Sequence, residues 1–234
     1  MPSSPDGNLF KCWHSPNPAM NVFRFNDDLL TDKTYIEAQI FFGRRSHIIQ
    51  VEPITKEHSF LKCLQNFVRK WGAPSTRILG DHASNQSSFK VMDYLRILWI
   101  GFWCSEAYYQ HQNMFERRYQ TFKRVINHTM DRTGTPPKLW FLCMQYVAYV
   151  LNRVSDPSLN NHQPIFVATG GQIGNISAML PFHWLEPVYY KADDSPFPSK
   201  SPELFGYWVG IAEHFGHAMT FIIWNKNTDK FLHH

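Results

Sequence analysis

The sequence predicts an α/β domain followed by a small β-rich module, and three observations support this. A block of strand-like segments comes first, and helical and strand patterns alternate after it, which is typical of a sheet covered by helices. The chain has 234 residues, of which 44% are apolar and 16% aromatic, so it can bury a core without disulfide or metal support. Beyond residue 182 the pattern changes to short strands separated by Pro, Ser, Gly and Asn.

Each element of the α/β domain is predicted from its own pattern. Runs with period-two alternation or continuous apolar residues indicate strands, whereas apolar residues three and four apart indicate helices. The helix predicted around residue 64 ends at Gly72, which is a common stop signal. In chain order the predicted elements are strands at Leu29–Tyr35, Ala38–Gly43 and Ser46–Pro53, a helix at 60–71, a strand at Arg77–Asp81, a helix marked by Phe89, Met92, Leu95 and Leu98, and a strand at Gly101–Tyr108.

Two further helices are predicted at the end of the α/β domain. The first begins near Gln112 and stops at the Gly-Thr-Pro-Pro sequence of residues 134–137. The second, Leu139–Val154, is apolar on nearly all sides and is therefore expected to be buried. The first of these helices has an apolar stripe of Phe115, Tyr119, Phe122, Ile126 and Met130, and a polar side that carries Glu116, Gln120, Lys123, Arg124 and Asn127.

These patterns divide the chain into four parts. Residues 1–22 are expected to be an irregular, proline-containing lead-in, and residues 23–154 form the α/β core. A linker over 155–182 leads to a small, truncated β-rich module over 183–234. No apolar run is long enough for a membrane span, and the start lacks the pattern of a secretory signal, so an intracellular, soluble protein without a membrane partner is expected.

Positive charge is concentrated in the two late helices. The chain as a whole has a net charge of +4, but residues 112–153 hold seven basic and two acidic residues, which leaves −1 for the rest. Such a stripe is typical of a phosphate-backbone binder, although a solvated helix face is an equally simple explanation. The module from 183 onwards has six acidic and four basic residues, so protein contacts are expected there rather than the main DNA contact. The four cysteines, Cys12, Cys63, Cys104 and Cys143, have no metal or redox spacing and are expected to be free thiols.

Three carboxylates fall where the predicted elements could bring them together. Asp32 lies in the first strand, Asp81 ends the fourth strand, and Glu116 lies on the first turn of the basic helix. Such an oxygen-only set suits Mg²⁺ or Mn²⁺ rather than zinc. Two of these ions roughly 4 Å apart would activate an attacking oxygen and stabilise the leaving oxygen of a phosphoryl transfer.

Each carboxylate also has a simpler explanation. Asp32 could be a turn residue beside Lys33, and Asp81 could cap a loop. Glu116 could complement the dipole of its own helix. Spacing alone therefore leaves the site open.

The residues around the carboxylates resemble a known family. The run SEAYYQHQNMFERR, residues 105–118, resembles the stretch around the catalytic glutamate of copia-type retrotransposon integrases, and thirty-four residues separate Asp81 from Glu116. The resemblance is closest to the copia-like elements of diatoms and extends over roughly residues 15–234. Further matching segments are NDDLLTD (26–32), AQIFFGR (38–44), RILGD (77–81), MDRTG (130–134), EPVYYK (186–191) and GHAMTF (216–221).

The resemblance implies a fold, an activity and a set of partners. The implied fold is RNase H-like, a mixed five-stranded sheet flanked by helices. The implied activity is 3′-end processing of the element's cDNA and its strand transfer into target DNA, in the nucleus after cytoplasmic synthesis, by self-associating chains. Asp32, Asp81 and Glu116 match the catalytic triad, which would bind two Mg²⁺ (or Mn²⁺) ions. The expected DNA-binding residues are Asn113, Arg117, Gln120, Lys123 and Arg124.

The chain also departs from the family pattern, which keeps two alternatives open. Its first hairpin is shorter, because only Lys33 to Glu37 separate the first strand's aspartate from Ala38, and Met114-Phe115 stands where the family has Pro-Ala. The His-His-Cys-Cys zinc module of the family has no match here. One alternative is therefore a catalytically inactive DNA-binding remnant, and another is an RNase H-like fold whose 12 histidines merely titrate.

Overall fold

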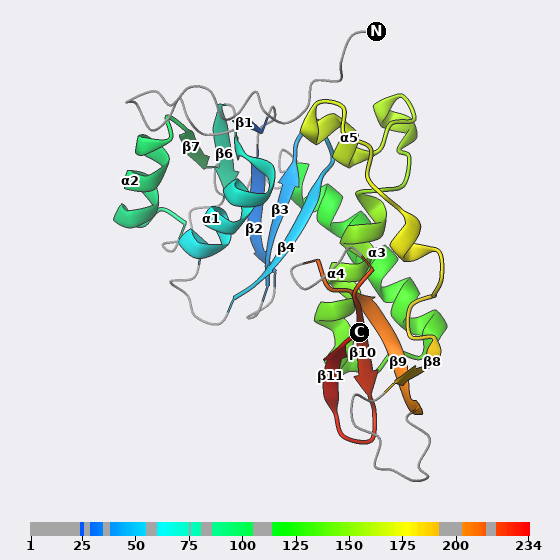
Figure 1. Ribbon diagram of the computed structural model, residues 1–234. Coiled ribbons are helices and arrows are strands. Elements are labelled where there is room, and N and C mark those ends of the chain that lie inside the picture. The colour runs from blue at the N-terminus through cyan, green and yellow to red at the C-terminus, as the bar shows by residue number, and fades with distance from the viewer. Residues whose placement is uncertain are drawn as a thin grey trace, which may run out of the picture.

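The structure is a computed structural model whose described residues form two larger sheets, a two-stranded pair and several helices (Figure 1). None of its described helices is long and apolar enough to cross a membrane. The described residues are 24–25, 29–34, 38–54, 60–74, 76–80, 86–104, 114–191, 203–213 and 219–234. The helices are α1 (Phe60–Trp71), α2 (Phe89–Ile97), α3 (Met114–Thr133), α4 (Trp140–Leu151) and α5 (Pro164–Thr169), with single 3₁₀ turns at Pro137–Leu139, Pro157–Leu159 and Ser177–Met179.

A mixed sheet with helices on both faces forms the centre of the described structure and confirms the predicted α/β class. β3 runs antiparallel to both of its neighbours, β2 and β4, whereas β2, β6 and β7 run parallel to one another. The order across this five-stranded sheet is β4–β3–β2–β6–β7. Its strands are β2 (Leu29–Thr34), β3 (Ala38–Gly43), β4 (Ile49–Pro53), β6 (Arg77–Gly80) and β7 (Gly101–Cys104), and a separate parallel pair joins β1 (Arg24–Phe25) to β5 (Ala73–Pro74).

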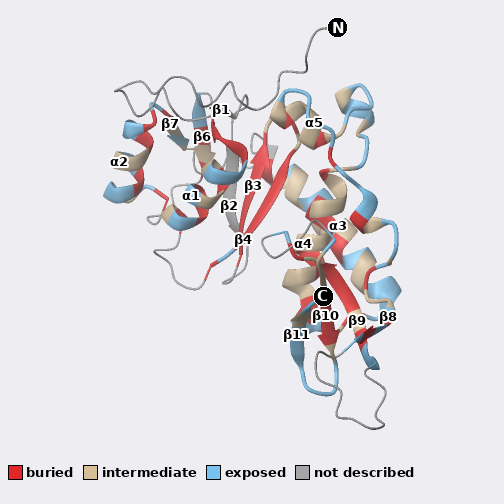
Figure 2. Cartoon of the chain, in the orientation of Figure 1, coloured by how far each residue is buried: buried red, intermediate tan, exposed pale blue. Residues whose placement is uncertain are grey.

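Alternation along β3 divides the core between the two faces of the sheet. Phe41 is fully buried against α1, where its ring centroid lies 5.3 Å from that of Phe67. Ile40 and Phe42 are buried on the opposite face, in the cluster formed with α3 and α4. Figure 2 shows β3 and β4 as buried strands between the helices of the two sides. A strand buried on both faces has a near-continuous apolar sequence, and β3 (AQIFFG) fits this except for the buried Gln39.

The helix predicted from Phe89, Met92, Leu95 and Leu98 is present as α2, but only part of this apolar pattern is buried. Leu95 and Leu98 are buried, whereas Phe89 and Met92 are 83% and 41% exposed. Val91 is buried instead, because the side of the helix that meets α1 follows Val91, Leu95 and Leu98 at spacings of four and three residues.

Element ends also shift by a few residues. The strand expected over Gly101–Tyr108 is described as β7 only to Cys104, and residues 105–113 lie outside the described part. The basic helix is described as α3 from Met114 onwards, and Gln112, near which its start was predicted, lies outside the described residues. The hairpin of β2 and β3 closes at the pair Thr34↔Ala38, so the short connection is compatible with a fully paired β2.

A second, antiparallel sheet follows the helices, in the order β11–β10–β9–β8. Its strands confirm the short β segments predicted near residues 188, 209 and 222, and they pack against α4. Tyr146 of α4 stacks on Trp184 and meets the edge of Trp208, at centroid distances of 5.2 and 5.5 Å. The predicted boundaries at 154 and 182 stay a prediction. The strands are β8 (Pro187–Lys191), β9 (Glu203–Ile211), β10 (Phe221–Asn225) and β11 (Lys230–His233).

The described cysteines are free, as the sequence predicts. Burial raises the pKa of the Cys63 and Cys143 thiols to about 12 each. Both side chains are therefore protonated and unreactive at neutral pH. Cys104 is half-buried at the end of β7, and Cys12 lies outside the described residues.

An ion pair fixes the hairpin between β3 and β4 and gives the fold an acid-sensitive contact. His47 has a φ of 61°, and its Nδ1 lies 2.7 Å from Oδ2 of Asp156. Burial alone would raise the pKa of Asp156, but hydrogen bonds from Ser158 and His47 outweigh it and hold that pKa below 3.8. A depressed carboxyl pKa means that the stabilisation is complete above the unfolded value and is lost as the pH falls through the folded value.

We therefore expect Asp156→Asn to flatten the acid limb of the stability curve. The wild-type protein should lose at most about 1 kcal/mol of stability as the pH falls through the lowered pKa of Asp156, and the variant should lack this stabilisation at every pH. Urea unfolding from pH 6 to 3 measures the difference. Parallel curves for the two proteins would contradict the role of the pair.

Candidate functional site

The first predicted carboxylate belongs to the central strand of the main sheet. The backbone of Asp32 lies within β2 and pairs with Ile40 of β3. On its other side β2 runs parallel to β6, with Leu29 opposite Ile78 and Leu30 opposite Leu79. The structure therefore places Asp32 in a paired strand despite the short hairpin, but its side chain lies outside the described part.

Two other predicted residues lie outside the described residues altogether. Asp81 directly follows Gly80, the last residue of β6, in the sequence. Asn113 directly precedes α3. Neither the convergence of the three carboxylates nor the place of Asn113 is therefore tested.

Glu116 is described together with its surroundings. It lies in the first turn of α3 and is half-buried. Its Oε1 accepts a hydrogen bond of 2.5 Å from Nε2 of Gln120, one turn further along the same helix. This bond holds the carboxylate on the polar side of α3, the side that the sequence predicts.

Aromatic packing fixes the start of α3 against the sheet. Phe42 of β3 meets Phe115 and Phe122 edge-on, at centroid distances of 5.2 and 6.0 Å. Both helix residues are buried, at 4% and 2% exposure. Since Glu116 follows Phe115, these contacts decide where its carboxylate lies relative to β2 and β3.

Arg118 makes a further anchor that the sequence did not reveal. Its guanidinium donates to the carbonyl oxygens of Gly43 and Arg44, at the end of β3. The sequence places Arg118 among the basic residues of the helix, where it is indistinguishable from its neighbours. The structure shows that this arginine holds α3 to the sheet. The sequence could not reveal this role, because no spacing rule predicts a hydrogen bond to a carbonyl group seventy-five residues away.

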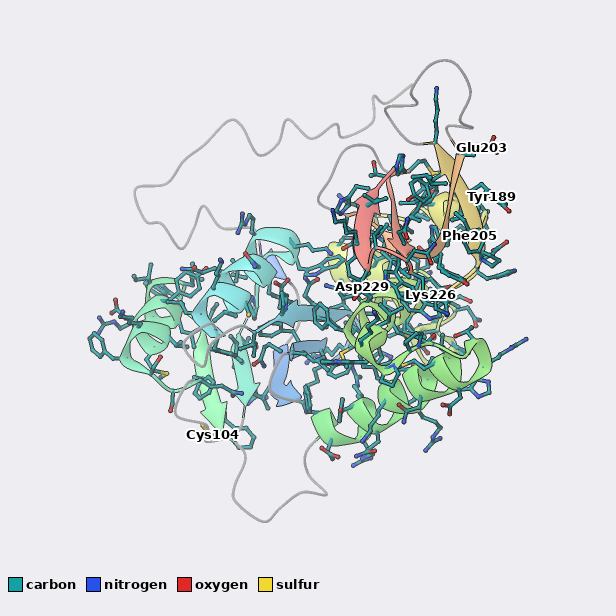
Figure 3. The ribbon with its side chains drawn as sticks, turned by 90° about the horizontal axis from the view of Figure 1, so that it is seen from below. Cys104, Tyr189, Glu203, Phe205, Lys226 and Asp229 are labelled. Carbon is teal, nitrogen blue, oxygen red and sulfur yellow. The ribbon has the colours of Figure 1, made fainter. Side chains whose placement is uncertain are left out.

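The remaining predicted DNA-binding residues lie along α3. Arg117, Gln120 and Arg124 are exposed, whereas Lys123 is half-buried. Residues three and four apart share one side of a helix, so Gln120 and Lys123 or Arg124 are neighbours there. Figure 3 shows side chains of α3 projecting outward along the helix, away from the sheet. The described part of the chain thus has a basic surface next to Glu116.

The described residues hold no group of three or more His, Cys, Asp or Glu side chains that could bind a metal ion. Glu116 is the one member of the predicted triad whose side chain is described. The donor set itself, three carboxylates, fits a hard divalent cation that prefers oxygen ligands. A cleft of about 790 Å³ lies elsewhere, lined by β4, α1, α4 and β9, and none of the predicted site residues lines it.

The fold resembles that of solved integrases, although no protein-family model and no curated protein sequence matches the chain. The catalytic core domain of BIV integrase superposes with a TM-score of 0.50 at 13% identity, over 62% of this chain and 95% of that one. The simian T-cell lymphotropic virus intasome, in complex with PP2A regulatory subunit B56 gamma, gives 0.54 at 12% identity, over 89% of this chain and 75% of that one. The HTLV-2 integrase core, in complex with magnesium, gives 0.49 at 15% identity, over 61% and 96%. The BIV and simian T-cell lymphotropic virus structures therefore show that the chain shares the mixed α/β fold of an integrase catalytic core.

Proposed function

We propose that this chain is the core of a copia-type integrase, a metal-dependent polynucleotidyl transferase that joins cDNA ends to target DNA. The observation that carries the proposal is the register of the adjacent parallel strands β2 and β6. Leu30 pairs with Leu79, and each strand's aspartate follows two positions later in the sequence. The same register, continued, would set Asp81 beside Asp32, on the sheet face where α3 carries Glu116.

The proposed chemistry follows from these residues. Asp32, Asp81 and Glu116 would hold Mg²⁺ or Mn²⁺, which when bound supplies Lewis acidity at the reacting phosphate and lowers the pKa of an attacking oxygen. In strand transfer, the cDNA 3′-oxygen loses its proton and bonds to the phosphorus of the target, and the target's own 3′-oxygen leaves. In end processing, a water oxygen loses a proton and bonds to a phosphorus near the cDNA end, and the cDNA 3′-oxygen leaves.

The role of α3 is to hold the nucleic acid. Arg117, Gln120 and Arg124 are exposed along the helix beyond Glu116, where they would contact phosphates and fix the position of the backbone. Asn113, directly before α3, and the half-buried Lys123 would add to this DNA-binding surface. Fixing the reacting phosphate next to the carboxylates supplies the positional part of catalysis. The fold likeness to the BIV core supports this assignment, as does the sequence resemblance around Glu116.

An assay with purified protein tests the proposal. With Mn²⁺ and a labelled duplex carrying the element's end, we expect joined products in a target plasmid. If no product forms with Mg²⁺ or Mn²⁺ at any protein concentration at which DNA is bound, the enzymatic function is wrong.

The exposed basic side of α3 also supports a second candidate, a DNA-binding remnant without catalysis. If α3 neutralises about three phosphates, the logarithm of the binding constant should fall with a slope near −2.7 against the logarithm of the salt concentration. We expect Arg124→Ala to make this slope shallower by about 0.9.

Arg96→Ala is the matched control for the salt dependence. Arg96 is 80% exposed but lies on α2 and pairs with Asp93, so its loss should leave the slope unchanged. A binding constant that does not depend on salt would contradict both candidates, whereas salt-dependent binding without joined products would favour the remnant.

A further inference from the structure

Trp103 is an exposed aromatic residue at the edge of the main sheet. It lies in β7, and 53% of its surface is exposed. Its neighbour Phe102 packs into the cluster formed with α1 and α2. Because successive side chains in a strand point to opposite faces, Trp103 points to the face of the sheet that α3 and α4 cover.

The strand registers place Trp103 in one row with the residues under α3. Trp103 pairs with Leu79, Leu79 with Leu30, and Leu30 with Phe42. Phe42 is the residue on which Phe115 and Phe122 of α3 pack. One end of this row is therefore covered by α3, while its β7 end is open to solvent at Trp103. Figure 3 shows Cys104, the next residue, at the end of β7 on the side of the molecule where α3 begins.

The distance from Trp103 to the proposed metal site follows from sheet geometry. Asp32 lies two strands across and two residues along from Trp103. With strands about 4.8 Å apart and about 3.3 Å per residue, the two Cα atoms are roughly 12 Å apart. At the axial rise of about 3.4 Å per nucleotide of a duplex strand, this separation corresponds to about three or four nucleotides.

The exposed apolar residues of α2 do not form a single protein-binding patch together with Trp103. Phe89 and Met92 are exposed on α2, which packs on the opposite face of the sheet from the one to which Trp103 points. A partner protein seated on α2 would leave Trp103 uncovered. Trp103 instead shares its cross-strand row with Phe42, on which α3 packs.

We propose that Trp103 is a nucleobase-binding residue that stacks on an unpaired base about three nucleotides from the reacting phosphate. This inference rests on the proposed function, because it places nucleic acid on the α3 face of the sheet. An indole stacks on any of the four bases. The proposed contact therefore favours DNA ends with a short single-stranded overhang, whatever their sequence.

The test compares a blunt duplex with a duplex that carries a three-nucleotide overhang, both fluorescently labelled. We expect Trp103→Ala to weaken binding of the overhang duplex about tenfold, with the blunt duplex and the salt slope unchanged. Trp103→Phe should restore most of the affinity, and Trp103→Gln should not. Trp99→Ala is the matched control, since Trp99 is 73% exposed in the turn before β7.

Other results would overturn the proposal in distinguishable ways. Equal losses for both duplexes would mean a general effect on DNA binding, and no loss for either would mean that Trp103 does not touch DNA. A change from dimer to monomer by light scattering in Trp103→Ala would assign the residue to a contact between two copies. If the wild-type protein binds no DNA, both the proposed function and this inference fail. If the wild-type protein carries out strand transfer but Trp103→Ala binds the overhang duplex as tightly as the wild type, only this inference fails.

Discussion

Asp81→Asn is expected to lower the rate of strand transfer by roughly a thousandfold. A metal-bound site supplies several kcal/mol of transition-state stabilisation, and about 4 kcal/mol corresponds to that factor. Asparagine keeps the size of the side chain but removes the charge that a hard cation needs. Glu116→Gln should give a loss of similar size, because both side chains belong to the same proposed site. The rate of product formation at saturating Mn²⁺ and DNA measures the effect.

Asp131→Asn is the matched control for this loss. Asp131 is exposed near the far end of α3, three turns or more beyond Glu116, so its replacement should leave the rate within about twofold of wild type. DNA binding should persist in all three variants, because the basic side of α3 is intact. An Asp81→Asn variant that joins DNA as fast as the wild type would show that Asp81 is no part of the site.

Phe122→Ala is expected to lower the free energy of unfolding by about 3–5 kcal/mol. Phe122 is 2% exposed and lies between α3 and the sheet, where it meets Phe42. Truncation to alanine removes the buried ring and leaves a cavity at the contact that fixes the helix carrying Glu116. Urea denaturation followed by circular dichroism measures the loss.

Phe89→Ala provides the comparison for the same chemical change at an exposed position. Phe89 is 83% exposed on α2, so its truncation should change the free energy of unfolding by no more than about 0.5 kcal/mol. If Phe122→Ala and Phe89→Ala have equal effects, α3 does not depend on the contact with Phe42 for its position.

The order of elements was predictable because each depends on a local pattern. The mostly apolar run of β3 and the apolar stripe of α3 are visible in the sequence, and both belong to the core around the sheet. The sequence pattern of α2 did not reveal that Phe89 and Met92 are exposed, because helical spacing shows which residues share a side but not which side meets the core. In α2 that choice depends on α1, which contributes to the same buried cluster.

The candidate site was predictable in part. The residue types and spacings pointed to Asp32, Asp81 and Glu116, and the structure sets Asp32 in β2 and Glu116 on the predicted side of α3. Local patterns could not reveal Arg118, whose partners are carbonyl groups at the end of a distant strand. The sequence also could not reveal that Trp103 is exposed to solvent. Its exposure depends on the order of the strands and on how much of the sheet α3 covers.

The central claim is that Asp32, Asp81 and Glu116 meet at one divalent-cation site. A crystal soaked in Mn²⁺ and measured at the manganese absorption edge tests it most directly. The proposed site predicts an anomalous peak next to Asp32 and Asp81, and the loss of that peak in Asp81→Asn. Fully soaked crystals with no peak between these strands, or with the two carboxylates 10 Å or more apart, would contradict it.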